Sequence, residues 1–123
     1  ISESSEIHLS DNLGIESGDM HRMVETADWL LYCLCELAKL IERVDLLEEL
    51  LILRKRTSYG IKEELVELVK VRGIGRVRAR RLYDHGIKTI SDLQQIPANK
   101  LAEIDKIGPT LADNIKSQLK KVR

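Results

Sequence analysis

Hydrophobic residues recur at steps of three and four along most of this chain, which is the spacing of one face of an α-helix. The longest run, Met20 to Glu42, contains no glycine or proline, and Asp19 precedes it in the position of an N-cap. Its apolar stripe consists of Met20, Met23, Val24, Ala27, Leu31, Leu34, Ala38 and Ile41. The pattern predicts a long amphipathic helix, preceded by loops or short turns in the polar residues 1–18.

Glycine and proline divide the rest of the chain into shorter helical stretches. The predicted helices span about residues 44–56, 61–71, 76–85, 91–95, 98–105 and 110–121. Ser91 is the predicted N-cap of its helix, Gly86 is a left-handed stop, and Pro109 lies near the first turn of the last helix, where proline is tolerated. Residues 57–60 form a break, which predicts a domain boundary between residues 1–59 and 60–123.

The composition agrees with a helical fold. Of the 123 residues, 43% are hydrophobic and only 3% are aromatic, with no Phe, so the core has to be aliphatic. Leu, Ile and Val dominate among the apolar residues, and only two prolines interrupt the chain. The predicted fold class is all-α: a partial helical bundle with one long helix, followed by a second all-helical domain.

The second half of the sequence repeats itself after a shift of 33 residues. The matching pairs are Leu68 with Leu101, Val71 with Ile104, Ile74 with Ile107, Gly75 with Gly108, Ala79 with Ala112 and Leu82 with Ile115. Ankyrin repeats have a similar period, but their Thr-Pro-Leu-His turn is missing. The unit, apolar-x-x-apolar-x-Gly-apolar-Gly-x-x-x-Ala-x-x-apolar, resembles the helix-hairpin-helix family, which binds DNA without regard to sequence. The resemblance implies a tandem of two hairpins.

The residue types of the first copy suit the binding of a phosphate. Gly73 and Gly75 permit a tight turn and remove side chains, so that a phosphate reaches backbone N–H groups at the start of the next helix. Ile74 anchors the turn in the core. No acidic residue occurs between Leu68 and Tyr83. The candidate DNA-binding residues here are Lys70, Arg72, Gly73, Ile74, Gly75, Arg76, Arg78, Arg80 and Arg81.

Charge separates the two halves of the chain. Residues 1–59 carry 6 Lys and Arg against 12 Asp and Glu, whereas residues 60–123 carry 14 against 8, a balance of −6 and +6. The basic half suits a polyanionic partner. The second copy of the hairpin departs from the pattern, since Lys106 replaces the first glycine, and Asp105 and Asp113 lie near the turn. We expect the first hairpin to bind DNA and the second to serve mainly for packing.

Arg22 and Trp29 lie seven residues apart, about 700° of helical rotation, so they are nearly in line and roughly opposite the apolar stripe. Trp29 is the only tryptophan. Geometry alone leaves two interpretations open. The ring packs on a domain outside this sequence, or it stacks on a nucleobase, with the Arg22 guanidinium stacking one step away.

Three stretches carry a more specific resemblance. GDMHRMVETADWL, from Gly18 to Leu30, is similar to the ratchet helix of archaeal superfamily 2 DNA helicases of the Hjm type, Ski-like enzymes that act on stalled replication forks. GIKEEL from Gly60 and RGIGRVRAR from Arg72 resemble the last domain of that family. The resemblance implies that Arg22 and Trp29 stack on bases in a single-strand channel, and that the last domain holds the emerging strand.

Neither a catalytic site nor a metal site is predicted. The chain has no Gly-x-x-x-x-Gly-Lys-Ser/Thr loop and no Asp-Glu box, and its His and Cys residues lack metal-ligand spacing. We expect no cofactor in this chain; ATP and Mg²⁺ belong to the motor domains that the resemblance implies. Free cysteines, with no signal peptide or membrane span, indicate a cytoplasmic protein, and the resemblance to DNA helicases implies that it is nucleoid-associated. The first residue, Ile1, indicates a fragment or a processed product.

The leading hypothesis is a DNA-binding, C-terminal portion of an ATP-dependent 3′-to-5′ DNA helicase in replication-fork repair and recombination. Its expected partners are single-stranded or forked DNA, the motor domains of the parent enzyme, and replication or repair proteins. The alternative is a hairpin module that docks a protein without touching DNA, with Trp29 as an interface anchor. Salt separates the two hypotheses, since phosphate contacts weaken steeply with added salt.

Overall fold

The computed structural model describes residues 2–121, and within this range every regular element is a helix. The all-α fold class predicted from the hydrophobic spacing is therefore confirmed. The chain divides into two compact units, Ile1–Glu63 and Glu64–Arg123. Among the residues that the structure describes, no helix has a hydrophobic stretch that would bridge a lipid bilayer.

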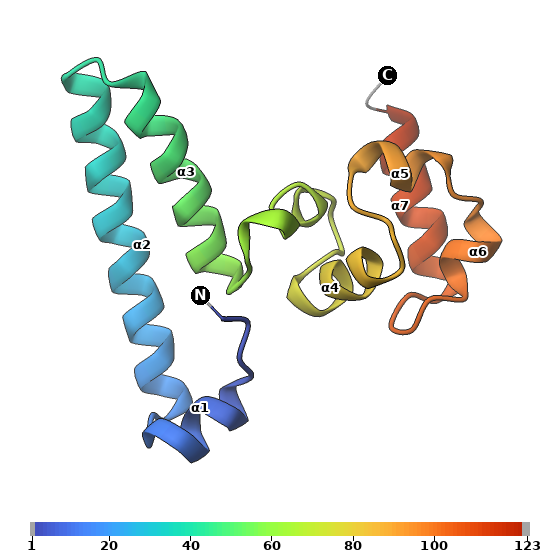
Figure 1. Ribbon diagram of the computed structural model, residues 1–123, viewed down its shortest axis with the longest axis horizontal. Coiled ribbons are helices and arrows are strands. Elements are labelled where there is room, and N and C mark those ends of the chain that lie inside the picture. The colour runs from blue at the N-terminus through green and yellow to red at the C-terminus, as the bar shows by residue number, and fades with distance from the viewer. Residues whose placement is uncertain (1, 122–123) are drawn as a thin grey trace. The chain divides into compact units, whose positions relative to one another are not determined.

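The first unit consists of a short helix and a long helical hairpin (Figure 1). Its helices are α1 (Glu6–Leu13), α2 (Ser17–Leu40) and α3 (Val44–Tyr59). Helices α2 and α3 lie side by side and run in opposite directions, joined by a three-residue turn in which Glu42 has a left-handed φ of +56°. The long helix predicted from the apolar stripe is thus present, and its partner is the next helix along the chain.

Several helix ends in this unit differ from the prediction. Residues 6–13 form α1 rather than a loop, because the Ser5 hydroxyl accepts the His8 N–H at 3.2 Å and Gly14 closes the helix at a φ of +64°. Helix α2 begins at Ser17, so Asp19 lies in its first turn rather than at the N-cap. Helix α3 continues to Tyr59, and the left-handed Gly60 alone makes the predicted break.

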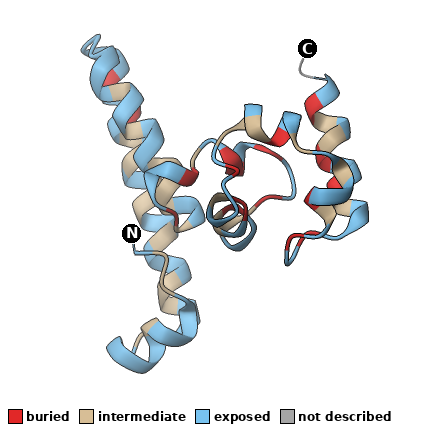
Figure 2. Cartoon of the chain, turned by 45° about the vertical axis from the view of Figure 1, so that its right-hand side comes forward, coloured by how far each residue is buried: buried red, intermediate tan, exposed pale blue. Residues whose placement is uncertain are grey.

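The apolar stripe of α2 is covered only along its centre. Ala38 is buried, and Met20, Val24, Ala27 and Leu31 are half-buried, whereas the flanking Met23, Leu34 and Ile41 are exposed. A bidentate ion pair joins the two long helices: Arg54 donates to both carboxylate oxygens of Asp28, at 2.7 and 3.1 Å. The hydrogen bond from Arg54 lowers the pKa of Asp28 by more than desolvation raises it, so this pKa lies below its usual value. Pale exposed segments dominate the hairpin (Figure 2), so its core is thin.

The second unit buries a continuous aliphatic core. A 3₁₀ helix at Glu63–Leu65 spans the boundary between the units, and the second unit continues with a 3₁₀ helix at Leu68–Lys70, α4 (Arg76–Asp84), α5 (Ile90–Gln95), α6 (Ala98–Ala102) and α7 (Pro109–Lys121). Each of these elements contributes at least one buried residue. The core residues are Leu65, Leu68, Val69, Val71, Ile74, Ala79, Leu82, Ile87, Leu93, Leu101, Ile104, Ile107, Ala112, Ile115 and Leu119.

The predicted helix over residues 61–71 is wrong in type. Two 3₁₀ turns occupy this segment instead. The segment buries Ile61, Leu65, Leu68, Val69 and Val71, so its apolar spacing contains steps of both three and four and does not by itself distinguish a 3₁₀ turn from an α-helix. The β-branched valines of the segment lower its preference for an α-helix.

Two further helix boundaries differ from the sequence prediction. Helix α5 is capped by Thr89 rather than Ser91: its hydroxyl accepts the Asp92 N–H, and the Asp92 carboxylate accepts the Thr89 N–H in return. Helix α6 ends at Ala102, short of the predicted residue 105. The following turn contains Lys106 in the left-handed region, at a φ of +69°.

The predicted internal repeat is confirmed by burial and by backbone conformation. All five apolar pairs of the 33-residue shift are buried in both copies. Gly73 in the first copy and Lys106 in the second occupy equivalent positions, and their φ values of +91° and +69° are both left-handed. The second copy therefore keeps the backbone of the hairpin turn without its first glycine.

Candidate nucleic-acid interface

The first hairpin turn is fixed from inside the protein and open to the outside. Ile74 is only 2% exposed, and its N–H donates to the Val71 carbonyl at 3.1 Å, so it anchors the turn as predicted. Gly75 follows in extended conformation as the N-cap of α4, and has no side chain to cap the helix. The N-cap residue itself therefore contributes no side-chain cap to the N-terminal end of α4.

Gly75 provides open space at the N-terminal end of α4. A Cβ atom at Gly75 would meet no atom within 4 Å, so the region outside the turn is empty. The first-turn N–H groups of a helix lack intrahelical partners and form the positive end of its dipole. Arg76, the first residue of the nine-residue α4, lies half-buried beside the turn. The site is chemically suited to a phosphate.

The second turn has the same space but weaker donors. Ile107 anchors it by donating to the Ile104 carbonyl at 3.0 Å, and a Cβ at Gly108 would also meet nothing within 4 Å. The first residue of α7, however, is Pro109, which has no N–H to offer. Arg76 of the first copy corresponds to this proline. The difference between the hairpins therefore lies in donors and charge, not in the space at the turn.

Arg78 joins the two turns within the protein. Its Nε donates to the Lys106 carbonyl at 2.9 Å, and a second guanidinium nitrogen donates to the Gly73 carbonyl at 3.0 Å. These carbonyls belong to equivalent residues of the two copies. Arg78 therefore acts as a link between the hairpins, a role that the spacing along the sequence does not indicate.

Arg80 and Arg81 also have protein partners. Arg80 forms an ion pair with Glu64 at 2.7 Å, lies 3.9 Å from Asp84, and stacks 5.3 Å from the ring of Tyr83. Arg81 lies 3.4 Å from Asp105 in the second copy, and both side chains are about half exposed. Their contact with DNA stays a prediction, and these ion pairs would compete with it.

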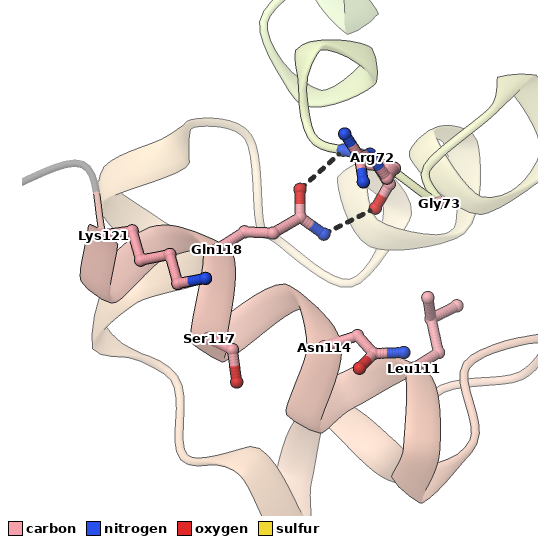
Figure 3. Close-up of a pocket in the computed structure, with 7 residues that line it drawn as sticks. All are labelled: Arg72, Gly73, Leu111, Asn114, Ser117, Gln118 and Lys121. Atoms are coloured by element: carbon pink, nitrogen blue, oxygen red, sulfur yellow. Dashed lines mark hydrogen bonds between the residues drawn. The ribbon is translucent and has the colours of Figure 1, made fainter.

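Lys70 and Arg72 are exposed on the approach to the first turn. The main chain of Arg72 is clamped by one side chain from the last helix, Gln118, as Figure 3 shows. The Gln118 amide oxygen accepts the Arg72 N–H, and its amide nitrogen donates to the Arg72 carbonyl, both at 3.0 Å. No spacing in the sequence indicated this contact, which joins residues 46 positions apart.

Arg22 and Trp29 lie on the surface of α2 in the first unit. Trp29 is 63% exposed, and the Arg22 side chain is 74% exposed, held by an ion pair with Asp19 one turn earlier. Asp28, on the side of α2 that faces α3, lies about 100° from Trp29 around the helix. Both residues are thus displayed away from the covered stripe, the geometry required for stacking on a group from outside.

The His, Cys, Asp and Glu side chains are scattered over the described residues. Within residues 2–121, no three His, Cys, Asp or Glu side chains gather as a metal site would require. Cys35 is buried and Cys33 is half-buried, both as free thiols. The candidate residues for DNA contact are therefore basic residues and glycines of the second unit, and Arg22 and Trp29 of the first.

Comparison with known proteins finds a similar family for each half of the chain. A family model described as "Archaeal helicase, domain 4" matches residues 1–60, and one described as "SAM-like Helix-hairpin-helix tandem" matches residues 65–121. Proteins named "ATP-dependent DNA helicase Hel308" are similar over nearly the whole chain. That of Thermococcus kodakarensis is 40% identical over 94% of this chain and 10% of its own length. Those of Thermoplasma acidophilum and Pyrococcus horikoshii are 41% and 38% identical, over 94% and 97% of this chain and 17% of their own lengths.

Proposed function

Since this chain belongs to the family of archaeal helicases and spans 10–17% of the relatives compared above, we propose that it is the part of a larger ATP-dependent DNA helicase that holds single-stranded DNA. In the complete enzyme, ATP and Mg²⁺ bind to separate motor domains, and unwinding proceeds 3′ to 5′ during replication-fork repair and recombination. This chain contributes grip rather than catalysis.

One observation carries the proposal: the open turn at Gly75. It combines empty space, the N-terminal end of α4 and a run of basic residues without an acidic neighbour between Leu68 and Tyr83. Backbone N–H groups contact phosphate oxygens irrespective of the base, so the grip is independent of sequence. A motor that moves along DNA requires such a contact.

The exposed face of α2 supplies the second part of the proposal. Arg22 and Trp29 offer flat surfaces about 10 Å apart along the helix axis, on which bases of a single strand stack. Stacking on aromatic rings is tolerant of sequence, because every base has a π-face. Each unit thus contributes one kind of contact: bases stack on α2, and phosphates bind at the first hairpin.

The test measures the affinity of the chain for a labelled single strand at several salt concentrations, beside duplex and forked DNA. We expect affinity to fall steeply with salt, by a slope of about 0.7 for each phosphate contacted on a single strand. Binding that hardly changes with salt would instead support the alternative, an apolar protein-docking module. The exposed apolar residues of the first unit, such as Leu40 at 79%, are the specific observation in favour of that alternative.

Trp29 allows the stacking proposal to be tested directly, because its fluorescence is the only tryptophan signal in the chain. We expect single-stranded DNA to quench it, and Trp29→Ala to lower affinity by roughly 1–3 kcal/mol, the value of one stacked base. Leu40→Ala is the matched control: Leu40 projects from nearly the same face of α2 but has no ring. Equal losses from both variants, or an unquenched Trp29 in the bound state, would contradict stacking.

A further inference from the structure

A cleft of about 380 Å³ lies directly beside the first hairpin turn, within the second unit. One wall is formed by Arg72 and Gly73, and the other by the face of α7 that carries Leu111, Asn114, Ser117 and Lys121 (Figure 3). Its volume lies in the range of small-molecule sites. The proposed grip at Gly75 makes no use of this cleft.

The two ends of the cleft differ in chemistry. Lys121 and the Arg72 guanidinium provide positive charge near the C-terminal end of α7, and Figure 3 shows Asn114 beside Leu111 toward the other end. Asn114 and Lys121 are seven residues apart, about 10 Å along the helix. The cleft is therefore cationic at one end, and combines an amide with an aliphatic surface at the other.

These groups are available to a ligand. Within residues 2–121, neither the Arg72 guanidinium nor the Asn114 amide forms a hydrogen bond or ion pair. Ser117 donates its hydroxyl proton to the Asp113 carbonyl at 2.8 Å, which leaves its oxygen as an acceptor toward the cleft. Asp113 is exposed in the turn of α7 that carries Asn114, so a phosphate is disfavoured at that end.

The wall of the cleft is held in place by the Gln118 clamp. Both hydrogen bonds of its amide go to the Arg72 main chain, so Gln118 positions the wall rather than the ligand. Leu111 packs so closely against the turn that a Cβ at Gly73 would lie 2.8 Å from its Cδ1. The cleft is thus built from a fixed turn and a regular helix, and its groups are pre-organised.

We propose that this cleft binds one nucleotide of the strand that the first hairpin holds, with the phosphate on Arg72 and Lys121 and the base edge on Asn114. The base lies over Leu111, and the Asn114 amide offers it one acceptor and two donor hydrogens. The Watson–Crick edges of a single strand are exposed, so an amide can serve any base. The inference rests on the proposed DNA-binding function and adds a base contact to it.

The experiment compares matched variants of the whole chain on two probes, a labelled oligothymidylate and an abasic strand of equal length. Asn114→Leu should lower affinity for the oligothymidylate about twofold to tenfold, the effect of one hydrogen bond, and leave the abasic strand unaffected. Asn99→Leu is its control, because Asn99 is exposed on α6 and does not line the cleft. Lys121→Gln should lower the salt slope by about 0.7, whereas Lys120→Gln, which lines a different groove, should not.

The outcomes separate the cleft from the function on which it rests. If the unsubstituted chain fails to bind either probe, the proposed function fails. If it binds, but Asn114→Leu matches Asn99→Leu and Lys121→Gln matches Lys120→Gln, the cleft proposal alone is overturned. Proton–nitrogen correlation spectra supply a second measurement: we expect the Asn114 side-chain amide to shift on titration with oligothymidylate and the Asn99 amide to stay in place, and the reverse would also overturn the proposal.

Discussion

The two hairpins of the second unit share one backbone and differ in the groups attached to it. Both turns are anchored by a buried isoleucine, both have a left-handed residue at the first glycine position, and both leave open space at the second glycine. The first has a non-proline residue at the start of its helix and no acidic residue between Leu68 and Tyr83, whereas the second has Pro109 at that position and Asp105 and Asp113 near its turn. The two copies therefore share the backbone of the hairpin, but they do not share the hydrogen-bond donors that suit the first copy to a phosphate.

The residue at one equivalent position of each copy contacts the turn of the other copy, but the two contacts differ in chemistry. Arg78 reaches from the first copy to the Lys106 carbonyl, whereas its counterpart Leu111 packs against Gly73. A polar contact in one direction and an apolar contact in the other hold the turns together. The second copy thus serves as a scaffold for the first, and each prediction below separates scaffold from site.

The largest effect is expected at the second glycine of each turn. Gly75→Val should lower affinity for single-stranded DNA at least about tenfold, because the side chain occupies the space through which a phosphate reaches charge-assisted N–H donors. Gly108→Val, the same change in the other copy, should leave affinity within about twofold, since Pro109 offers no N–H there. Anisotropy titrations of both variants, checked for folding by circular dichroism, decide the matter. Equal losses of affinity would show that the hairpins are functionally alike.

The next effect concerns the first glycine position and stability. Gly73→Ala should cost about 1–2 kcal/mol in unfolding free energy, because its φ of +91° is unfavourable for any residue with a Cβ. Lys106→Gly should stabilise the protein by a few tenths of a kcal/mol, since relief of the same strain is offset by the entropy of glycine. Urea unfolding measures both changes. Destabilisation by Lys106→Gly would mean that the lysine side chain itself stabilises the second turn.

The repeat and its core could be predicted from sequence because both depend on local spacing. Burial of Leu68 with Leu101, or Ala79 with Ala112, follows from apolar residues recurring at the same offsets. The 3₁₀ turns were missed because the buried residues from Ile61 to Val71 recur at steps of three and four, the spacing typical of an α-helix. Helix α1 was missed because its eight residues are mostly polar and bury nothing.

The candidate site was predicted only in its local part. The Gly73–Gly75 turn follows from motif spacing, whereas the Gln118 clamp and the Arg78 link depend on contacts over 46 and 28 residues. Periodicity contains no information about such contacts. An arginine run near a phosphate motif therefore predicts a positively charged surface. It does not predict which of the arginines forms hydrogen bonds or ion pairs within the protein.

A smaller effect is expected when the link between the copies is removed. Arg78→Ala should destabilise the second unit by about 1 kcal/mol, because two carbonyls lose a charged donor at a partly solvated site. Val77→Ala, next to it and 52% exposed, is the control. Unfolding and binding are measured together. We expect the salt slope to remain unchanged; a slope lowered by about 0.7 with no loss of stability would assign Arg78 to the DNA instead.

The smallest effect concerns α5, which connects the hairpins and belongs to neither copy. The N–H groups of Lys88 and Thr89 donate to the Asp92 carboxylate, and these bonds hold its pKa below the ordinary value of 3.8. The unfolded chain therefore takes up the proton first, so this stabilisation is complete well above pH 3.8 and is lost as the pH falls through the lower, folded pKa. Asp92→Asn removes this titration while retaining an acceptor oxygen. The stability advantage of the unsubstituted chain over Asp92→Asn should thus shrink between neutral pH and pH values below 3.8, as measured by urea unfolding, with Asp113→Asn as the exposed control. A constant difference across this range would show that the carboxylate is not needed in its charged form, and that the connector depends on the Thr89 hydroxyl alone.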